Sequence, residues 1–281
     1  MKSKYVMAII SCIALLSSCV TYNNFYQIYK TNTSDSMSSN NEFITYEDDN
    51  CIISYDLWDR GGNIGFNFYN KSNENLYLIM DESFFILNGI AHDYYKGRSY
   101  SNSLSSGIIT NQGLTASKSL AGQNSLNFTQ TNRVSAEISQ GISTAKGVSI
   151  TTVEQKLICI PSKASKIIKE YSISETRIKN CDLLKYPTKK QVKTIFFSKE
   201  DSPIVFSNRL TYRKGTNDKL IKIENEFYVS EITNYPESEV FTSDYEKFCG
   251  EESLNKVQFF KIATPDRFYI DYINTPSKWK H

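Results

Sequence analysis

Side chains that could act as acids, bases or nucleophiles near neutral pH are few in this chain of 281 residues. Histidine occurs only as His92 and His281, so a catalytic triad would have to use His92, which stands beside Asp93. Neither a Gly-x-Ser-x-Gly elbow nor a His-Glu-x-x-His motif is present. We therefore interpret His92 as an exposed hairpin residue and predict that the protein is not an enzyme.

One pair of carboxylates stands close to an aromatic residue, since Asp56 and Asp59 flank Trp58. Two carboxylates in a cleft could hydrolyse a glycosidic bond. However, Asp59 opens a Gly-rich turn, where Asp commonly binds its own backbone, so we favour a structural role for both. Trp58 could stack on a sugar ring, but we expect it to pack in a core between two sheets.

The chain also offers few metal ligands, and we predict no cofactor. The acidic run at residues 47–50 lacks the ligand and glycine spacing of a calcium loop and is interpreted as a solvated strand entry. Beyond the N-terminus there is no Cys-x-x-Cys pair or Cys/His cluster that would indicate zinc. The four cysteines there allow three disulfide pairings, and free thiols or one disulfide both stay open: Cys51, Cys159, Cys181 and Cys249.

The N-terminus carries the most specific signal. Lys2 and Lys4 precede an apolar run at residues 6–16, which is followed by Leu16-Ser17-Ser18-Cys19. A charged start, a short apolar run and small residues form a secretory signal, and the run is too short to cross about 30 Å of hydrocarbon. The segment resembles the lipobox of bacterial lipoproteins, in which the cysteine is acylated and becomes the first residue. We therefore expect a signal peptide at residues 1–18 and lipidation of Cys19.

Composition bounds the rest of the chain. The 32 Lys and Arg residues include Lys2 and Lys4, so the mature chain balances 30 basic against 30 acidic residues. This balance leaves no basic footprint for nucleic acid or an anionic membrane surface. Aromatic residues make up 13 % of the chain, with 19 Tyr and 16 Phe, which favours β structure.

Residues 19–41 contain the lipidated cysteine and a segment rich in Ser, Asn and Thr. We expect this segment to be a flexible tether with a root-mean-square reach of ~25 Å. Within it, Asp35-Ser36-Met37 resembles the Asp-Ser/Thr-apolar sequon for O-glycosylation in Bacteroidetes, which makes Ser36 a candidate acceptor.

From residue 42 onward the hydrophobic pattern alternates with period 2. Residues 51–57 and 64–68 predict a hairpin around Gly61-Gly62, and residues 76–80 predict a third strand. Residues 83–87 and 90 onward flank Asn88-Gly89, which is a strong two-residue hairpin signal. Further strands are expected at 148–160, 167–173, 192–197, 204–212, 220–223, 227–232, 257–262 and 268–273, with a short helix or turn at 245–249.

One segment interrupts this pattern. Residues 100–147 are dominated by Ser, Gly, Asn, Thr and Gln and bury too little apolar surface to offset their ordering entropy. We expect a mobile insertion there, in which residues 117–142 could form a weak helix. The predicted fold is all-β: one antiparallel β-sandwich domain, immunoglobulin-like or related, at residues 42–281.

Four segments resemble a group of uncharacterised Bacteroidetes lipoproteins: residues 53–58 (ISYDLW), 64–72 (IGFNFYNKS), 160–163 (IPSK) and 225–234 (NEFYVSEITN). In that group a strand ends in Trp, the next ends in Asn-Lys-Ser or Asn-Lys-Leu, and a Ser/Gly-rich insertion precedes an Ile-Pro-Pro-like strand. Here Ser162 replaces the second proline. The resemblance implies a β-sandwich and no known activity, and it transfers no site residue.

These observations predict a membrane-anchored, non-catalytic binding or envelope-assembly module with a protein partner in the cell envelope. Surface-exported Bacteroidetes lipoproteins resemble one another in an acidic patch after the anchor cysteine, whereas residues 20–24 contain no acidic residue. We therefore expect the protein on the outer membrane, facing the periplasm. The alternatives are a glycan-binding lipoprotein and, less favoured, a small hydrolase using Asp56 and Asp59.

Overall fold

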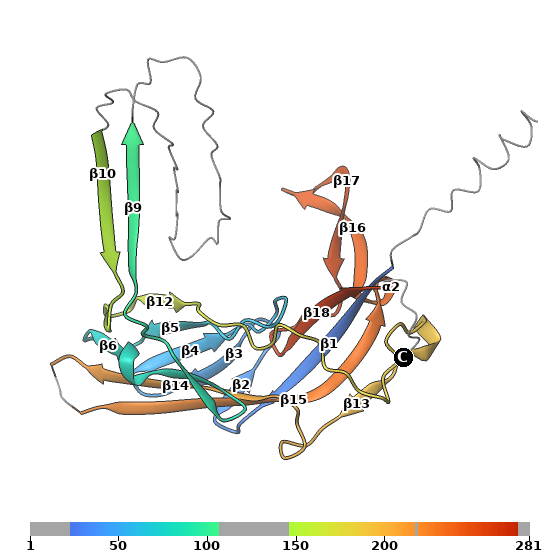
Figure 1. Cartoon of the computed structure of the whole chain (residues 1–281), viewed down its shortest axis with the longest axis horizontal. Helices are drawn as coiled ribbons and strands as arrows, with labels where there is room; N and C mark the ends of the chain where they lie inside the picture. Colours follow the sequence, from blue (N-terminus) through green and yellow to red (C-terminus); the bar gives the residue numbers. More distant parts are fainter. Residues whose placement is uncertain (1–22, 107–145, 217–218, 275–281) are drawn as a thin grey trace, which may run out of the picture.

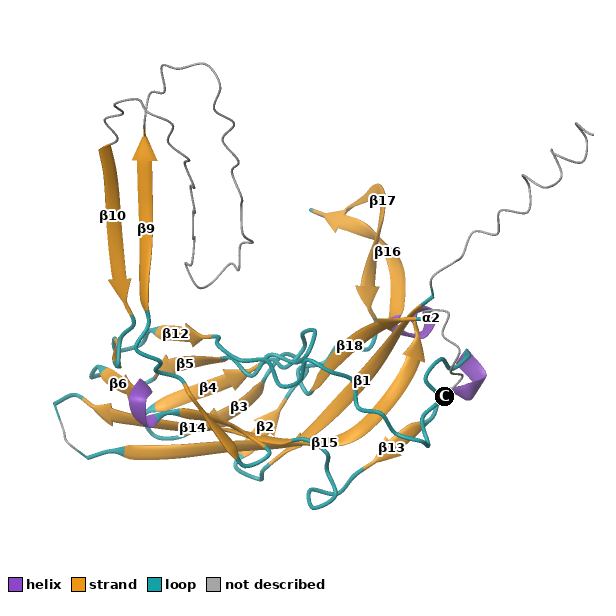
Figure 2. Ribbon diagram, viewed as in Figure 1, coloured by secondary structure: helices purple, strands orange, loops and turns teal. Residues whose placement is uncertain are grey.

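The computed structural model describes residues 23–106, 146–216 and 219–274. In this part of the chain the fold is all-β, with two curled antiparallel sheets packed face to face and short helical turns at their margins (Figures 1 and 2). The predicted antiparallel, sandwich-like architecture is thus confirmed. Two strand ribbons, β9–β10 and β16–β17, project from one side of this body (Figure 1).

The larger sheet contains the two long strands β14 and β15, and its main order is β11-β6-β14-β15-β1-β18. Strand β13 also pairs with β15, and the β7–β8 hairpin joins the sheet through β14. Its strands are β1 (Asn24–Thr33), β6 (Leu76–Ile79), β7 (Phe84–Leu87), β8 (Ile90–Asp93), β11 (Leu157–Ile160), β13 (Thr194–Phe196), β14 (Val205–Lys214), β15 (Ile221–Pro236) and β18 (Arg267–Ile273).

The smaller sheet has the order β12-β5-β4-β3-β2. Its strands are β2 (Met37–Ser39), β3 (Ile44–Glu47), β4 (Cys51–Tyr55), β5 (Phe66–Asn70) and β12 (Ser165–Ile168). Three short helical turns complete the body, at Met80–Glu82, at Lys189–Gln191 and at α2 (Glu237–Val240). The ribbons are formed by β9 (Ser99–Ser106) with β10 (Lys146–Val153), and by β16 (Phe241–Phe248) with β17 (Glu251–Phe260).

The main core lies between the two sheets and consists of aliphatic and aromatic side chains from both. The Tyr55 ring meets the Phe227 ring edge to face at 5.2 Å, and Phe68 meets Tyr212 in the same way at 5.6 Å. The buried Tyr55 hydroxyl accepts a hydrogen bond of 2.8 Å from the Asn225 side chain, so this polar group has a partner.

Several predicted strands are confirmed where the sequence alternates. Residues 51–57, 64–68 and 76–80 contain β4, β5 and β6, and β4 pairs with β5 as an antiparallel pair. Asn88 and Gly89 have φ values of 47° and 81°, which fit the tight hairpin turn that the sequence predicts between β7 and β8. The strands predicted at 192–197, 204–212 and 268–273 correspond to β13, β14 and β18.

Other predictions need correction. Residues 245–248 belong to strand β16, and Cys249 lies in the turn that joins β16 to β17. No helix forms at 245–249. The two strands expected at 220–223 and 227–232 are one strand, β15, and residues 169–173 follow β12 without continuing it. Residues 99–106 and 146–153 form the β9–β10 ribbon, whereas residues 107–145, including the whole of the expected helix at 117–142, lie outside the described residues.

The prediction of a flexible tether up to residue 41 is also wrong within the described residues. Strand β1 starts at Asn24 and lies between β15 and β18, paired with both. Five consecutive side chains from Phe25 to Tyr29 are buried, because one face of β1 meets the main core and the other a second cluster. A strand buried on both faces has no polar-apolar alternation, which is why its sequence resembles a linker.

We expect Tyr29→Ala to destabilise the protein by about 3–5 kcal/mol, because this fully buried ring stacks on Phe268 at 4.5 Å. The matched control Asn32→Ala, at an exposed position of the same strand, should change the free energy of unfolding by less than about 0.5 kcal/mol. Urea denaturation of both variants measures the difference. Equal stability of the two variants would contradict a structural β1.

Candidate functional site

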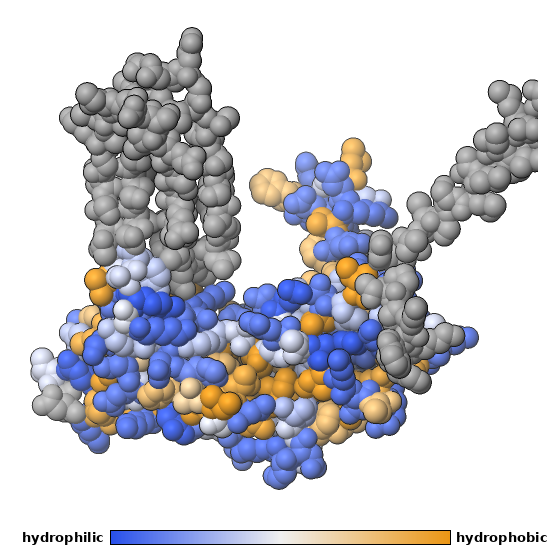
Figure 3. Space-filling view, in the orientation of Figure 1, coloured by the Kyte–Doolittle hydropathy of each residue, from blue (hydrophilic) through white to orange (hydrophobic). Residues whose placement is uncertain are grey.

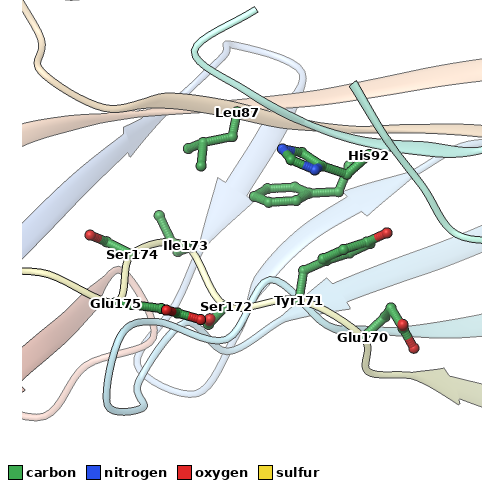
Figure 4. A pocket seen from close by; sticks show the side chains of 9 residues that line it. Leu87, His92, Glu170, Tyr171, Ser172, Ile173, Ser174 and Glu175 are labelled. Atoms are coloured by element: carbon green, nitrogen blue, oxygen red, sulfur yellow. The ribbon is translucent and has the colours of Figure 1, made fainter. Parts of the chain in front are cut away.

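A cleft of about 410 Å³ lies between the β7–β8 hairpin and residues 170–175 (Figure 4). A second hollow of about 380 Å³ adjoins it and shares three of its lining residues. The cleft is lined by Phe85, Leu87, His92, Glu170, Tyr171, Ser172, Ile173, Ser174 and Glu175. The second hollow adds Arg60, Gly61 and Ile270 to the shared Ser172, Ser174 and Glu175.

The segment between the two hollows is held by the Gly61-Gly62 turn. The N–H groups of Ile173 and Ser174 donate to the Gly61 carbonyl at 3.0 and 2.8 Å, and the Ile173 side chain is buried. A Cβ on Gly62 would lie 2.7 Å from Ile173 Cδ1, and both glycines have φ near +78°. These glycines are needed for close approach as well as for the turn.

One wall of the cleft is aromatic. Phe85 stacks on His92 at 5.8 Å and on Tyr171 at 5.3 Å, both with an interplanar angle of 28°. The Tyr171 hydroxyl donates to the Asp93 carbonyl, and its ring, half-exposed, faces the cleft opposite His92 (Figure 4). Such ring faces can bind a flat apolar surface, including the face of a sugar or of another aromatic group.

An ion network closes the end of the cleft nearest the β9–β10 ribbon. Arg98, just before β9, donates to Glu154 and Glu170 at 2.6 Å each, and Lys96 donates to Glu170 at 3.0 Å. Burial disfavours the charged form of Glu154, but hydrogen bonds from the Arg98 side chain and from two backbone N–H groups outweigh it and lower the pKa of that carboxyl. Because Arg98 precedes β9 and Glu154 follows β10, the network joins both strands of the ribbon, at its base, to residues 170–175.

The ionisable side chains of the cleft differ in their contacts. Among the described residues the His92 imidazole makes ring contacts and no side-chain hydrogen bond, so no nucleophile stands within hydrogen-bond reach of it. The Glu170 carboxylate already accepts from Arg98 and Lys96. In the described part of the chain, no group of three or more His, Cys, Asp or Glu side chains is arranged to hold a metal ion.

The structure separates the other candidate residues from this cleft. Asp56 and Asp59 are exposed, and each accepts a hydrogen bond from a neighbouring backbone N–H, of Trp58 at 3.1 Å and of Arg60 at 2.7 Å. This is the local role that the sequence favoured. In the 47–50 run, Asp48 accepts from the N–H groups of Asn50 and Cys51 and thus shapes the entry to β4.

Two aromatic predictions are wrong in detail. Trp58 is half-buried but lies outside the core between the sheets, since it packs on Phe260 and Tyr269 in the second cluster at 5.0 and 5.2 Å. His92 is half-buried against Phe85 and is not fully exposed on its hairpin. The alternating pattern located the hairpin, but at 167–173 it predicted a strand, whereas residues 170–175 lie in a loop after β12 and approach the hairpin only in the folded chain.

The four cysteines of the described residues are free thiols. Cys51 is buried in the main core, and burial raises the pKa of its thiol well above the usual value. Cys159, Cys181 and Cys249 are exposed. Ser36 is exposed in the turn between β1 and β2, and Cys19 lies outside the described residues.

A second candidate surface is the β16–β17 ribbon, of which the sequence predicted only a strand at 257–262, overlapping the end of β17. Its exposed apolar side chains are Tyr245, Phe248, Leu254, Val257 and Phe259. The acidic residues between them hid the strand pattern at residues 245–249.

None of the helices in the described part of the chain is long and apolar enough to span a membrane.

Comparison with known proteins gives no relative: no family model, no curated protein and no solved structure matches this chain. The resemblance to Bacteroidetes lipoproteins therefore stays a prediction.

We expect Gly62→Ala to be more destabilising than Gly89→Ala by about 1–3 kcal/mol. Both glycines have φ near +80°, so alanine would be strained in the backbone at either position. Only at Gly62 would the new methyl group also overlap Ile173 and Phe268. Nothing lies within 4 Å of a Cβ at Gly89. Thermal or urea unfolding of the two variants compares them, and equal losses would contradict the close docking of residues 170–175.

Proposed function

We propose that this protein is a lipoprotein, acylated at Cys19, whose β-sandwich body is a non-catalytic binding or assembly module of the cell envelope. The observation that carries the proposal is the Leu16-Ser17-Ser18-Cys19 sequence after a charged and apolar N-terminus. The fold agrees with this reading, because a rigid sandwich commonly presents binding contacts on its loops and hairpins.

The position of β1 adds a geometric consequence. Only four residues separate Cys19 from Asn24, where β1 begins. Five residue steps span at most about 17 Å when fully extended. A lipid-modified Cys19 would therefore hold the β1 end of the body close to the bilayer, in place of the long flexible reach expected from the sequence.

For its location we propose the outer membrane, with the body facing the periplasm. The support is the absence of acidic residues from positions 20–24, where surface-exported lipoproteins of Bacteroidetes carry an acidic patch. The proposed partner is another envelope protein, bound at the cleft between the β7–β8 hairpin and residues 170–175.

The anchor is tested by Cys19→Ala. We expect this variant to lose palmitate incorporation, to remain unprocessed and to leave the lipid-anchored fraction after detergent phase separation, because the acylated thiol is absent. The control is Cys159→Ser, which replaces an exposed thiol elsewhere and should be labelled like the parent protein. Unchanged palmitate labelling of Cys19→Ala would refute the proposed anchor.

Glycan binding is the alternative that a specific observation favours. The half-exposed Tyr171 ring and the neighbouring His92 provide faces on which a sugar could stack, and Glu175 is an exposed acceptor at the same cleft. A protein partner and a glycan would use the same wall, so one experiment on the cleft separates them.

We expect a photo-crosslinking amino acid at Ser172, which lines both hollows and is exposed, to capture a discrete protein from native membranes. The same group at Ser38, an exposed position on β2, is the control and should capture none. Adding Tyr171→Ala to the Ser172 probe should reduce capture at least fivefold. Loss of the crosslinked product when purified envelope glycans are added before irradiation would favour the glycan alternative, and equal capture from both positions would contradict a binding cleft.

A further inference from the structure

The β16–β17 ribbon leaves the body as an isolated two-stranded element with large apolar side chains in solvent (Figure 3). Phe248 is 81 % exposed and Leu254 is 98 % exposed. Val257 and Phe259 lie on one face of the ribbon and Tyr245 on the other, because cross-strand partners share a face. A ribbon of two strands cannot bury both faces by itself, so these side chains lack a cover within the described chain.

The base of the ribbon is fixed to the body. Phe241 and Phe260, the first cross-strand pair, pack on Tyr26 of β1 at 5.4 and 6.1 Å between ring centroids. Phe260 also contacts Trp58 and Tyr269. This second cluster therefore joins the ribbon to β1 and sets the direction in which it projects.

The same contacts place the ribbon beside the point where the chain enters the fold. The Asn24 side chain donates to Glu237 at 3.3 Å, and Glu237 begins the α2 turn that leads directly into β16. In Figure 1 the start of β1 and the base of the ribbon lie together at one end of the body. Cys19 precedes Asn24 by only five positions, so a lipid anchor there would bring the bilayer to this end.

We propose that the tip of the β16–β17 ribbon inserts into the membrane leaflet that holds the acyl chains of Cys19, and that this second contact fixes the orientation of the body. The proposal rests on the acylation of Cys19. Lipid suits a two-sided ribbon, because acyl chains surround an inserted element, whereas a second protein chain would require one continuous apolar face. Insertion at a second point removes the rotation that a single tether permits.

The charge of the ribbon specifies the kind of bilayer. Residues 241–260 contain four acidic and two basic residues, so anionic lipid would repel the ribbon. Lys247 is paired with Glu252 at 3.1 Å, and Lys256 lies over the Tyr245 ring at 5.1 Å. The expected contact is therefore apolar insertion into zwitterionic lipid, with little dependence on salt.

The free thiol of Cys249 at the ribbon tip provides the probe. In the mature chain, residues 19–281, Cys159→Ser and Cys181→Ser leave Cys249 as the exposed thiol of the described residues for a polarity-sensitive fluorophore. The acylated protein is reconstituted into zwitterionic vesicles containing nitroxide-labelled lipid. We expect a blue shift and strong quenching at Cys249. The same label on Cys159, with Cys181→Ser and Cys249→Ser, should show neither change.

Substitutions at the ribbon tip test whether its apolar side chains cause the insertion. Phe248→Ser with Leu254→Ser should reduce the quenching at Cys249 at least fivefold, and both side chains are exposed, so the fold should be unaffected. Phe196→Ser, at a residue 72 % exposed on β13, is the matched control and should leave the quenching unchanged. Quenching that is equal at Cys249 and Cys159, or that is insensitive to the tip substitutions, would overturn the proposal.

A second arm separates this proposal from the proposed anchor. The mature chain with Cys19 replaced by a histidine tag is held on nickel-chelating zwitterionic vesicles, which reproduces the attachment point without acylation. Palmitate labelling that persists in Cys19→Ala would refute the anchor alone, whereas absent tip quenching in this arm would refute insertion. A dimer in sedimentation that Phe248→Ser dissociates, without quenching, would instead assign the ribbon to a second copy of the chain.

Discussion

Strand β1 is the element on which the rest of this structure depends. It lies between β15 and β18, pairs with both in antiparallel register, and has side chains buried on both faces. A strand in this position cannot be removed without exposing the hydrogen-bonding edges of its two neighbours and opening two apolar clusters. The segment that enters the fold first is therefore part of its centre, and it connects any anchor at Cys19 directly to the core.

Buried polar contacts extend from β1 towards the candidate site. Gln27 donates to the Asn234 side chain and to the Ile178 carbonyl at 2.9 Å each, and its own carbonyl oxygen accepts from the Ile178 N–H at 2.8 Å. These bonds satisfy a fully buried amide and fix the loop that continues from residues 170–175. The Gly61-Gly62 turn holds the other side of the same loop. The cleft is thus formed by a loop that has little regular structure and is nevertheless held at two points.

The alternating hydrophobic pattern predicted the strands that have one buried face and one more solvent-exposed face. In β4, Cys51, Ile53 and Tyr55 are buried and the residues between them are half-buried, so alternation was visible. It failed for β1, where both faces are covered and buried Gln27 and Thr31 resemble linker residues. It also failed for β16, an isolated ribbon strand whose exposure on both faces leaves no apolar side to detect.

The candidate site was less predictable than the fold. His92 was recognised as a hairpin residue, and Phe85 is its cross-strand partner there, but Tyr171 reaches both rings only through tertiary packing of a loop. The acylation proposed for Cys19 rests on a local motif, because signal sequences are read as short linear segments and need no fold. The distance between that motif and the core, however, follows only from knowing that β1 begins at Asn24.

Native-state hydrogen exchange of β1 tests the central claim most directly, since it reports on the strand in the unaltered protein. The account predicts that the amides of residues 25–31 exchange as slowly as those of β15, with opening free energies near that of global unfolding. Exchange of these amides on the timescale of an unstructured peptide would contradict it, because residues 24–33 would then be a tether outside the sheet.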